Sequence, residues 1–407
     1  MAIRIGRPVL VILSAAWIAV FFAASGLRAL ADCAAFGLPF ADLGSTSFCA
    51  EIAEAYFSGL SNGTSATTYA PSQNVPREQM AAFVTRTLDQ SLLRGNRRAA
   101  LDQWWSSSPH FDQTLATTTV GTSPTLLKSD GADVWVANFG NATVSRVRAS
   151  DGRLLQTWTS ATKAYGVLVA MGRVFVTANQ ATGTLYLINP SAASGAAVTV
   201  ATASLGAFPG AIAFDGNKIW TANSNNGLGG GSVSIVVPGT WTVTNVTTGF
   251  HEPIGLVFDG VHMWVTDATA TGTVLRKLDA NGAVLQSVAL GFGAGLPAFD
   301  GRNIWVPQSF DDTLSVVRVS DGVVLKTFPA NSNGMDEPSQ AAFDGQRIAV
   351  TNESAVNGTP SLSLFKATDL SAIGNFPLAG VTLPFGVCSD GVNFWVALGG
   401  SAEVGRF

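Results

Sequence analysis

Polar side chains recur along this chain at one kind of position, directly after a short apolar run that usually holds an aromatic residue. Side chains gathered from such equivalent positions would form an oxygen-rich ring, which can bind a polar ligand or hold Ca²⁺ or Mg²⁺. Asn and Asp at strand ends are also ordinary turn formers that need no ligand. The position is held by Asn138, Asn179, Asn223, Asp267, Gln308 and Asn352, with Leu398 as the exception. We predict ligand contacts from Asn138, Asn223, Asp267 and Asn352, around the mouth of a central channel.

A second group of residues has the types needed for proton transfer. His251 with Glu252 or Glu353 could form an acid–base pair beside that ring, which would be the catalytic set of an enzyme. The other histidines, His110 and His262, are expected to be structural. The sequence has no nucleophile elbow, no zinc-ligand spacing and no phosphate-binding loop. Catalysis is therefore left open, and a non-catalytic role is favoured.

A phrase repeated seven times predicts the elements that position these residues. It consists of a small turn, usually Asp-Gly, followed about four positions later by an aromatic residue in a β-branched run. Successive glycines are 41–46 residues apart, which is the period of one four-stranded propeller blade. The copies are Asp130-Gly131 with Trp135, Gly172 with Phe175, Asp215-Gly216 with Trp220, Asp259-Gly260 with Trp264, Asp300-Gly301 with Trp305, Asp344-Gly345 with Ala349, and Asp390-Gly391 with Trp395.

Further Asx-Gly turns, such as Asp151-Gly152 and Asn281-Gly282, make each repeat a four-stranded antiparallel meander. The last repeat ends after its third strand, and the segment 117–120 stands unpaired before the first repeat. Pairing these two segments would close a seven-bladed ring over residues 114–407 and remove its exposed sheet edges. Ala349 replaces the aromatic residue and predicts a looser sixth blade.

The run from Val134 to Ser145 resembles the YVTN family of β-propeller repeats, and similar phrases extend over residues 124–407. The resemblance implies a mainly β, seven-bladed propeller of the kind found in surface-layer and other exported proteins. Related propellers include the streptogramin lyases and gluconolactonase-like enzymes. They imply, as the alternative function, a metal-dependent lyase or lactonase with Ca²⁺ or Mg²⁺ at the channel mouth.

Composition and the N-terminus predict an exported globular protein. The chain is 47% hydrophobic and 12% charged, and its net charge of −4 gives no reason to expect nucleic-acid binding. Residues 1–31 have the pattern of a signal peptide: Arg4 and Arg7, an apolar run from Val9 to Ala24, and a small-residue cleavage site at 29–31. A retained membrane anchor and lipidation at Cys33 are the alternatives. We expect a secreted or envelope-associated protein with no membrane span after signal cleavage.

Residues 32–93 have helical rather than strand spacing and predict a small helix-loop-helix module. They resemble the bacterial S-layer homology module in Phe40-Ala41-Asp42, Tyr69-Ala70-Pro71 and the run from Val75 to Phe83. The resemblance implies docking to a cell-wall polysaccharide. Arg77 is its predicted ligand-binding residue, because an arginine at a helix N-terminus suits an anionic glycan. Residues 94–113 are expected to be a linker.

The three cysteines are too few for a disulfide scaffold. Cys33 and Cys49 are near enough in sequence to form a bridge after export, whereas Cys388 is expected to be a buried small hydrophobe. These observations together predict a monomeric, exported β-propeller that acts as a binding or scaffold protein for a cell-wall polysaccharide or another extracellular ligand.

Overall fold

A computed structural model describes residues 38–44, 52, 61, 63–75, 80, 84, 116–353, 360–378 and 383–407. For residues 116 and 198–204 it describes the backbone alone. The predicted signal peptide, the linker, Arg77, Cys33 and Cys49 lie outside these ranges. The chain divides into two compact units, Met1–Ser91 and Leu92–Phe407.

The described part of the first unit joins two of the segments on which the S-layer homology resemblance rests. The Asp42 carboxylate accepts hydrogen bonds from the backbone N–H groups of Tyr69 and Ala70, at 2.8 and 2.7 Å. These bonds hold the pKa of Asp42 below its usual value. The Phe40 and Tyr69 rings are 5.3 Å apart, and Phe40 belongs to a small buried cluster with Leu43 and Ile52.

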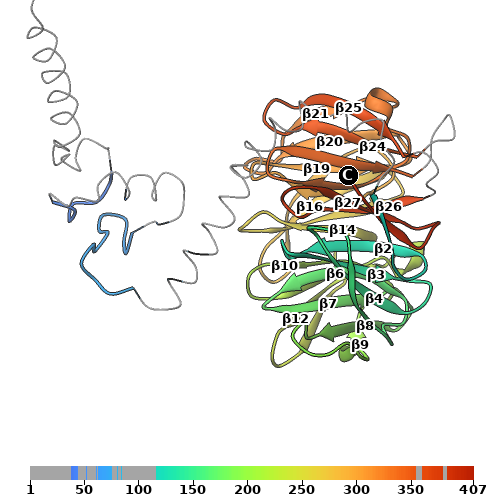
Figure 1. The fold of residues 1–407 in the computed structure, drawn as a ribbon. Helices are drawn as coiled ribbons and strands as arrows, with labels where there is room; N and C mark the ends of the chain where they lie inside the picture. Colours follow the sequence, from blue (N-terminus) through green and yellow to red (C-terminus); the bar gives the residue numbers. More distant parts are fainter. Residues whose placement is uncertain are drawn as a thin grey trace, which may run out of the picture. The chain divides into compact units, whose positions relative to one another are not determined.

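In the second unit the described strands form seven four-stranded sheets, the blades of a mainly β propeller (Figure 1). Blade 1 contains β2 (Pro124–Ser129), β3 (Asp133–Asn138), β4 (Thr143–Arg148) and β5 (Leu154–Trp158). Blade 2 contains β6 (Ala164–Ala170), β7 (Arg173–Ala178), β8 (Gly183–Ile188) and β9 (Val198–Leu205). Blade 3 contains β10 (Pro209–Phe214), β11 (Ile219–Asn223), β12 (Ser232–Val237) and β13 (Thr242–Val246), with the short 3₁₀ helix η3 (Asn225–Gly227) between β11 and β12.

Blade 4 contains β14 (Glu252–Phe258), β15 (Met263–Thr269), β16 (Gly272–Leu278) and β17 (Val284–Ala289). Blade 5 contains β18 (Ala298–Phe299), β19 (Asn303–Gln308), β20 (Thr313–Arg318) and β21 (Val324–Phe328), and η4 (Ser332–Gly334) follows it. Blade 6 contains β22 (Pro338–Phe343), β23 (Arg347–Asn352), β24 (Ser361–Lys366) and β25 (Ser371–Pro377). Blade 7 contains β26 (Pro384–Ser389), β27 (Phe394–Leu398) and β28 (Glu403–Arg406), with β1 (Ala116–Thr119) as its fourth strand. The seven meanders confirm the fold class predicted from the repeat.

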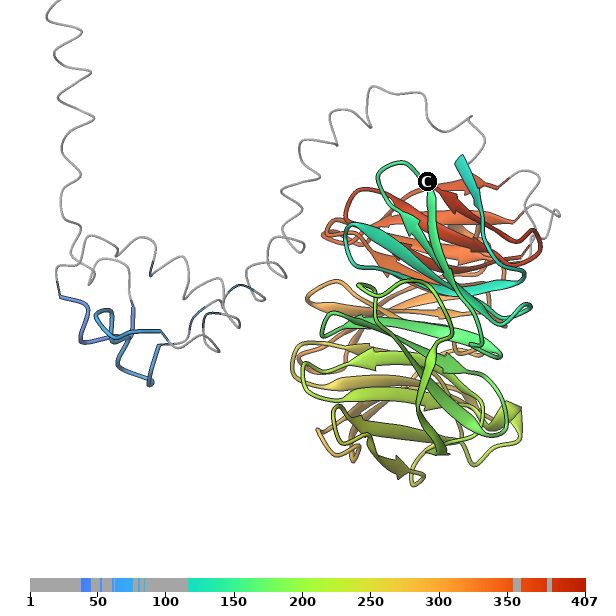
Figure 2. The same cartoon turned by 60° about the horizontal axis from the view of Figure 1, so that its bottom comes forward.

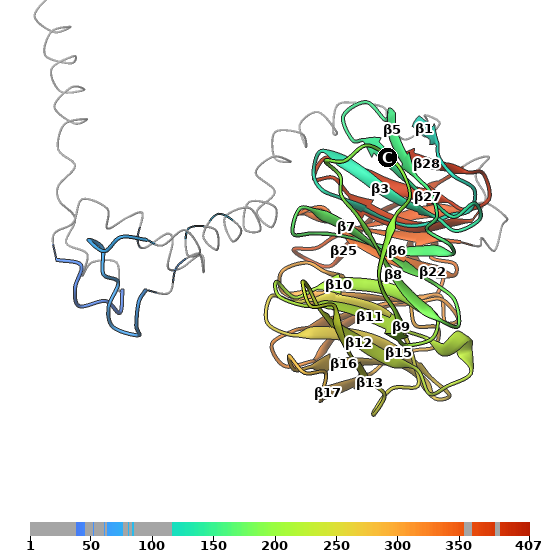
Figure 3. The same cartoon turned by 90° about the horizontal axis from the view of Figure 1, so that it is seen from below.

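The ring closes in blade 7, where the first strand of the propeller pairs with the last. β1 runs antiparallel to β28, with Thr117 opposite Gly405 and Thr118 opposite Val404. Figures 2 and 3 show this early strand beside the red C-terminal blade. The predicted seam is therefore confirmed, and β28 has a hydrogen-bonding partner on each side.

The Asp-Gly and tryptophan of the repeated phrase form one hydrogen-bonded unit. In blade 3, Oδ1 of Asp215 accepts the backbone N–H groups of Asn217 and Lys218, and Oδ2 accepts the indole N–H of Trp220 at 2.7 Å. Gly216 between them has a φ of 92°, a conformation that suits glycine. The tryptophans of the other copies donate to their aspartates at 2.7–3.0 Å: Trp135 to Asp130, Trp264 to Asp259, Trp305 to Asp300 and Trp395 to Asp390. Both carboxylate oxygens are thus used for folding.

Blade 6 replaces this unit with a different set of contacts. Arg347 donates from Nε to Oδ2 of Asp344 at 2.9 Å, the oxygen that binds indole elsewhere. Its guanidinium lies over the Phe394 ring of blade 7, 5.4 Å from the centroid. Phe394 occupies a position where the other blades have Val, Ile or Met, and it is buried in one cluster with Ala349. A larger side chain from the next blade therefore occupies this interface, and Ala349 itself is fully buried. The looser packing expected of blade 6 stays a prediction.

Candidate functional site

A cavity of about 220 Å³ lies where first strands begin and second strands end, and we call it the mouth cavity. Its walls come from the starts of first strands and from the residues that follow second strands. Apolar lining is provided by Tyr165, Pro253, Ile254, Ala294, Leu296 and Phe385, together with Gly210 and Gly295. Polar lining is provided by Asn179, Ser224, Ser309, Ser339 and Glu353. The face on which this cavity lies is the one that the sequence indicated for a ligand.

Irregular pairing at the starts of the first strands aims residues into this cavity. The register of β6 against β7 shifts between Ala164 and Val167, and the register of β26 against β27 shifts between Pro384 and Val387. Tyr165 and Phe385 lie within these shifts, as Ile254 does in β14. An irregularity of this kind bends a strand and redirects a side chain. In blades 2, 3, 6 and 7 the residue after the Pro or Ala that opens the first strand lines the cavity, and the predicted site did not include it.

Hydrogen bonds between blades hold the backbone of the two aromatic residues. Thr125 of blade 1 donates to the carbonyl oxygen of Tyr165 at 3.0 Å, and Thr351 of blade 6 donates to that of Phe385 at 2.8 Å. The Tyr165 and Phe385 ring centroids are 5.8 Å apart in an edge-to-face arrangement. Phe139 of blade 1 also contacts Tyr165, with 6.5 Å between the ring centroids. The aromatic wall is therefore built by several blades and positioned by their backbone contacts.

Glu353 is the ionisable carboxylate of the mouth cavity and follows directly after β23. Burial raises the pKa of its carboxyl, hydrogen bonding from Ser339 lowers it, and the nearby negative charge of Glu337 raises it further. Burial, and then the charge of Glu353, raise the pKa of the Tyr165 phenol, which keeps the phenol protonated. The cavity thus combines one carboxyl group of raised pKa with a neutral phenol.

The amides predicted to bind a ligand make structural contacts instead. Asn138, Asn223 and Asn352 are fully buried, and none of them lines the mouth cavity. Each amide nitrogen donates to two hydroxyls at the start of the third strand of its own blade. The partners are Thr143 and Ser145 at 3.0 Å for Asn138, Ser232 and Ser234 at 3.1 and 2.8 Å for Asn223, and Ser361 and Ser363 at 2.9 Å for Asn352. Ligand binding by these residues stays a prediction, and their burial argues against it.

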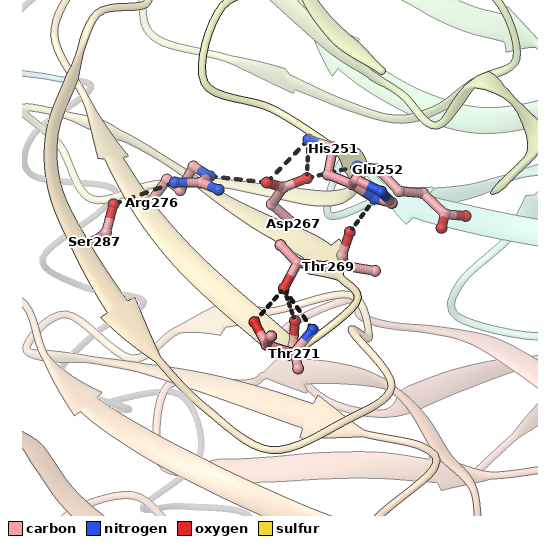
Figure 4. A network of polar contacts seen from close by, with 9 residues as sticks. His251, Glu252, Asp267, Thr269, Thr271, Arg276 and Ser287 are labelled. Carbon is pink, nitrogen blue, oxygen red and sulfur yellow. Dashed lines mark hydrogen bonds and ion pairs between the residues drawn. The ribbon is translucent and has the colours of Figure 1, made fainter. Parts of the chain in front are cut away.

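Asp267, the charged member of the predicted ring, accepts hydrogen bonds from three neighbouring residues (Figure 4). Its carboxylate accepts the backbone N–H groups of His251 and Glu252, at 3.0 and 2.7 Å, and the Nε–H of Arg276 at 2.8 Å. It is fully buried, and Arg276 reaches on to Ser287. These contacts fix the backbone at the start of β14, and the Asp267 side chain does not line the mouth cavity. For the asparagines of blades 1, 3 and 6, the Ser/Thr-x-Ser pattern that begins the third strand was the signal that the strand-end residue is used internally.

The predicted acid–base residues fall into two places. His251 and Glu252 are neighbours beside η3, and Nδ1 of His251 lies 3.0 Å from the carbonyl oxygen of Ala268. Burial raises the pKa of Glu252, its electrostatic interaction with His251 lowers it, and that with Asp267 raises it. Neither residue lines the mouth cavity, which contains Glu353. Across the described ranges no hydrogen bond or ion pair joins Glu353 to either of them.

The described residues form neither a candidate metal-binding cluster nor a membrane-spanning helix. Its residues contain no group of three or more His, Cys, Asp or Glu side chains placed to hold a metal ion. No helix within these ranges has the length and apolar character needed to span a bilayer.

Cys388 is buried and unbridged, and burial raises the pKa of its thiol to about 12. Its structural role was predicted from the sequence.

Comparisons with known proteins concern the propeller. No family model matches the chain, and no curated protein matches its sequence. A chain of Kuenenia stuttgartiensis hydrazine synthase is similar in structure, with a TM-score of 0.57, 14% identity, and coverage of 71% of this chain and 97% of that one. The WD40 β-propeller domain of Doa1 has a TM-score of 0.56 and 11% identity, and covers 72% and 96%. The β-propeller domain of Myceliophteria thermophila Cps50 (Swd1) has a TM-score of 0.56 and 12% identity, and covers 72% and 98%. These similarities show that the chain contains the β-propeller fold, which hosts varied functions.

Proposed function

We propose that this protein is an exported β-propeller that binds an extracellular ligand in the mouth cavity, without catalysing a reaction. The observation that carries the proposal is the cavity itself: apolar and aromatic walls with a few polar groups, where first strands begin. Binding sites of proteins are generally concave, mostly apolar and equipped with a few convergent polar groups. Export rests on the signal-like pattern of residues 1–31, and wall docking rests on the resemblance of residues 32–93 to the S-layer homology module.

Separation of the ionisable groups supports binding over catalysis. An acid–base mechanism needs both groups within reach of one substrate. Asp267 and His251 are engaged in backbone contacts, and Glu353 lies in the cavity without them. The mouth cavity is therefore better suited to hold a ligand than to move a proton from it.

A blocked cavity tests the proposal. Gly210 lines the cavity, and a Cβ added there would meet the Tyr165 ring at 3.7 Å, an ordinary contact distance. Gly210→Leu should fill the cavity without disturbing the blade. Ligand-observed NMR on the mature chain would use small neutral, anionic and cationic probes and soluble fragments of bacterial cell wall. At least one should bind to the wild type and lose binding in Gly210→Leu.

The matched control is Gly195→Leu, because a Cβ at Gly195 would meet no other atom within 4 Å. This variant should bind as the wild type does. Equal binding by wild type and Gly210→Leu for every probe, or no binding by any, would refute a ligand site at the channel mouth.

A metal-dependent lyase or lactonase is the second candidate, favoured by the adjacency of His251 to Glu252 and the raised pKa of Glu252. An ion that binds only the folded state stabilises it. If this candidate is right, EDTA should lower the melting temperature, added Ca²⁺ or Mg²⁺ should restore it, and His251→Ala should abolish turnover of a lactone. An unchanged melting temperature and no metal by elemental analysis would exclude it.

A further inference from the structure

We infer that the mouth cavity takes an alkylammonium group, with Glu353 as its counter-charge and the Tyr165 and Phe385 rings as its walls. The inference rests on the binding function proposed above and names the chemistry of the ligand. Either a small free amine or the side chain of a lysine in a peptide would supply such a group.

The charges around the cavity favour a cation. Glu353 is the one formally charged residue among the described residues that line it, and no Lys, Arg or His is among them. Glu337 adds negative potential, as its effect on Glu353 shows. A half-buried carboxylate without a basic partner is costly, because burial removes water that would otherwise solvate the charge. An incoming cation would offset that cost, whereas an anion would increase it.

Aromatic rings next to the carboxylate provide the second contact that an ammonium group needs. Tyr165 and Phe385 are half-buried, line the cavity and lie edge to face, 5.8 Å apart. Cations bind over aromatic faces within about 6 Å of the ring centroid, most strongly where water is excluded. The same face already shows such a contact, since Nζ of Lys163 lies 4.2 Å from the Phe139 centroid.

The cavity also suits the alkyl part of such a ligand. Ile254, Leu296 and Pro253 line it, and Leu296 is buried in a cluster that also contains Leu126 and Leu256. Among the described residues the Tyr165 hydroxyl has no hydrogen-bond partner, so it can accept a hydrogen bond from an ammonium N–H. An apolar wall, two rings and one carboxylate together match a short alkylammonium ion.

Probes that share one shape and differ in charge test this inference. Dissociation constants of n-butylammonium, n-butanol and butyrate would be measured by ligand-observed NMR on the mature chain. We expect n-butylammonium to bind at least about tenfold more tightly than n-butanol, because hydrogen bonds to charged groups are the stronger ones. Butyrate should show no binding. Nα-acetyl-lysinamide distinguishes the sources: tighter binding than n-butylammonium indicates a lysine in a peptide, and weaker binding indicates a free amine.

Variants locate the charge that is responsible. Glu353→Gln keeps the shape of the side chain and should weaken n-butylammonium about tenfold or more. Glu403→Gln removes one negative charge outside the cavity lining and keeps an oxygen that can accept the Thr117 hydroxyl, so it should leave the affinity within about twofold. Phe385→Leu keeps an apolar wall but removes a ring, and should weaken binding about two- to fivefold. An equal effect of Glu353→Gln and Glu403→Gln would overturn the role of Glu353.

A pH titration gives an independent readout. The pKa of Glu353 is raised above the ordinary 4.5, so its carboxylate is lost on acidification before that of an exposed glutamate. Affinity for n-butylammonium should fall as the pH is lowered through this raised pKa, and should change little in Glu353→Gln. A pH-independent affinity in the wild type would overturn the inference.

Gly210→Leu separates failure of the inference from failure of the proposed function. If a neutral or anionic probe binds and Gly210→Leu abolishes that binding, the site is real and the ammonium chemistry is wrong. If no probe responds to Gly210→Leu, the proposed function fails as well.

Discussion

At the scale of single residues, the aspartate of each Asp-Gly turn stabilises the fold, although a repeated carboxylate could also suggest a ligand site. Asp215 uses one oxygen for two backbone N–H groups and the other for the indole of Trp220, which is buried. A buried donor without a partner costs more than a hydrogen bond contributes on average. The tryptophan therefore depends on the aspartate, and blade 2, with Met171 and Phe175 at these positions, lacks both.

Asp215→Asn should expose this dependence. An amide nitrogen in place of Oδ2 would face the indole N–H as a second donor, so we expect a loss of about 1–3 kcal/mol in the free energy of unfolding, measured with urea. Asp279→Asn is the matched control, because Oδ1 of that partly exposed residue accepts only backbone N–H groups that an amide oxygen can also accept. A loss as large in the control would contradict the indole as the cause.

At the scale of elements, side chains of adjacent blades pack and form hydrogen bonds with each other at the interfaces between blades. Arg347 and Phe394 come from adjacent blades and occupy the interface that Ala349 leaves small. Thr177 and Thr266 donate across other interfaces to the carbonyl oxygens of Gly210 and Gly295, at 2.7 and 2.8 Å. At the interface of blades 6 and 7, the small side chain of Ala349 is thus matched by the larger Phe394 of the neighbouring blade.

The seam strand gives the prediction at this scale. A chain that starts at residue 120 lacks β1 and leaves β28 as an unpaired edge, which invites edge-to-edge association. It should melt at a lower temperature than a chain that starts at residue 116 and should aggregate earlier in light scattering. Equal melting temperatures for the two truncations would mean that β1 adds nothing to the ring.

At the scale of the whole molecule, two compact units carry the two proposed contacts. The first unit contains Arg77 and the Asp42 contacts, and the second contains the mouth cavity with Glu353. Sites without shared partners generally act additively. Wall docking and ligand binding should therefore respond to different substitutions.

A crossed experiment on the mature chain tests this separation. Arg77→Ala should reduce retention on purified bacterial cell walls and leave n-butylammonium affinity unchanged, whereas Glu353→Gln should do the reverse. Each variant serves as the control for the other. Equal wall retention of wild type and Arg77→Ala would contradict the docking role of the first unit.

The sequence by itself determined the number of blades, the turns and the seam, because these depend on local chemistry that repeats. Asp-Gly turns, β-branched runs, an unpaired segment before the first repeat and a last repeat that ends after its third strand are visible without any knowledge of packing. Only the tertiary structure decided which polar residues face the cavity. Asn138 and Asn223 end their strands as a ligand ring would require, yet their amide nitrogens already donate to third-strand hydroxyls. Tyr165 and Phe385 reach the channel through register shifts, and such shifts depend on pairing with a neighbouring strand that the order of residues does not display.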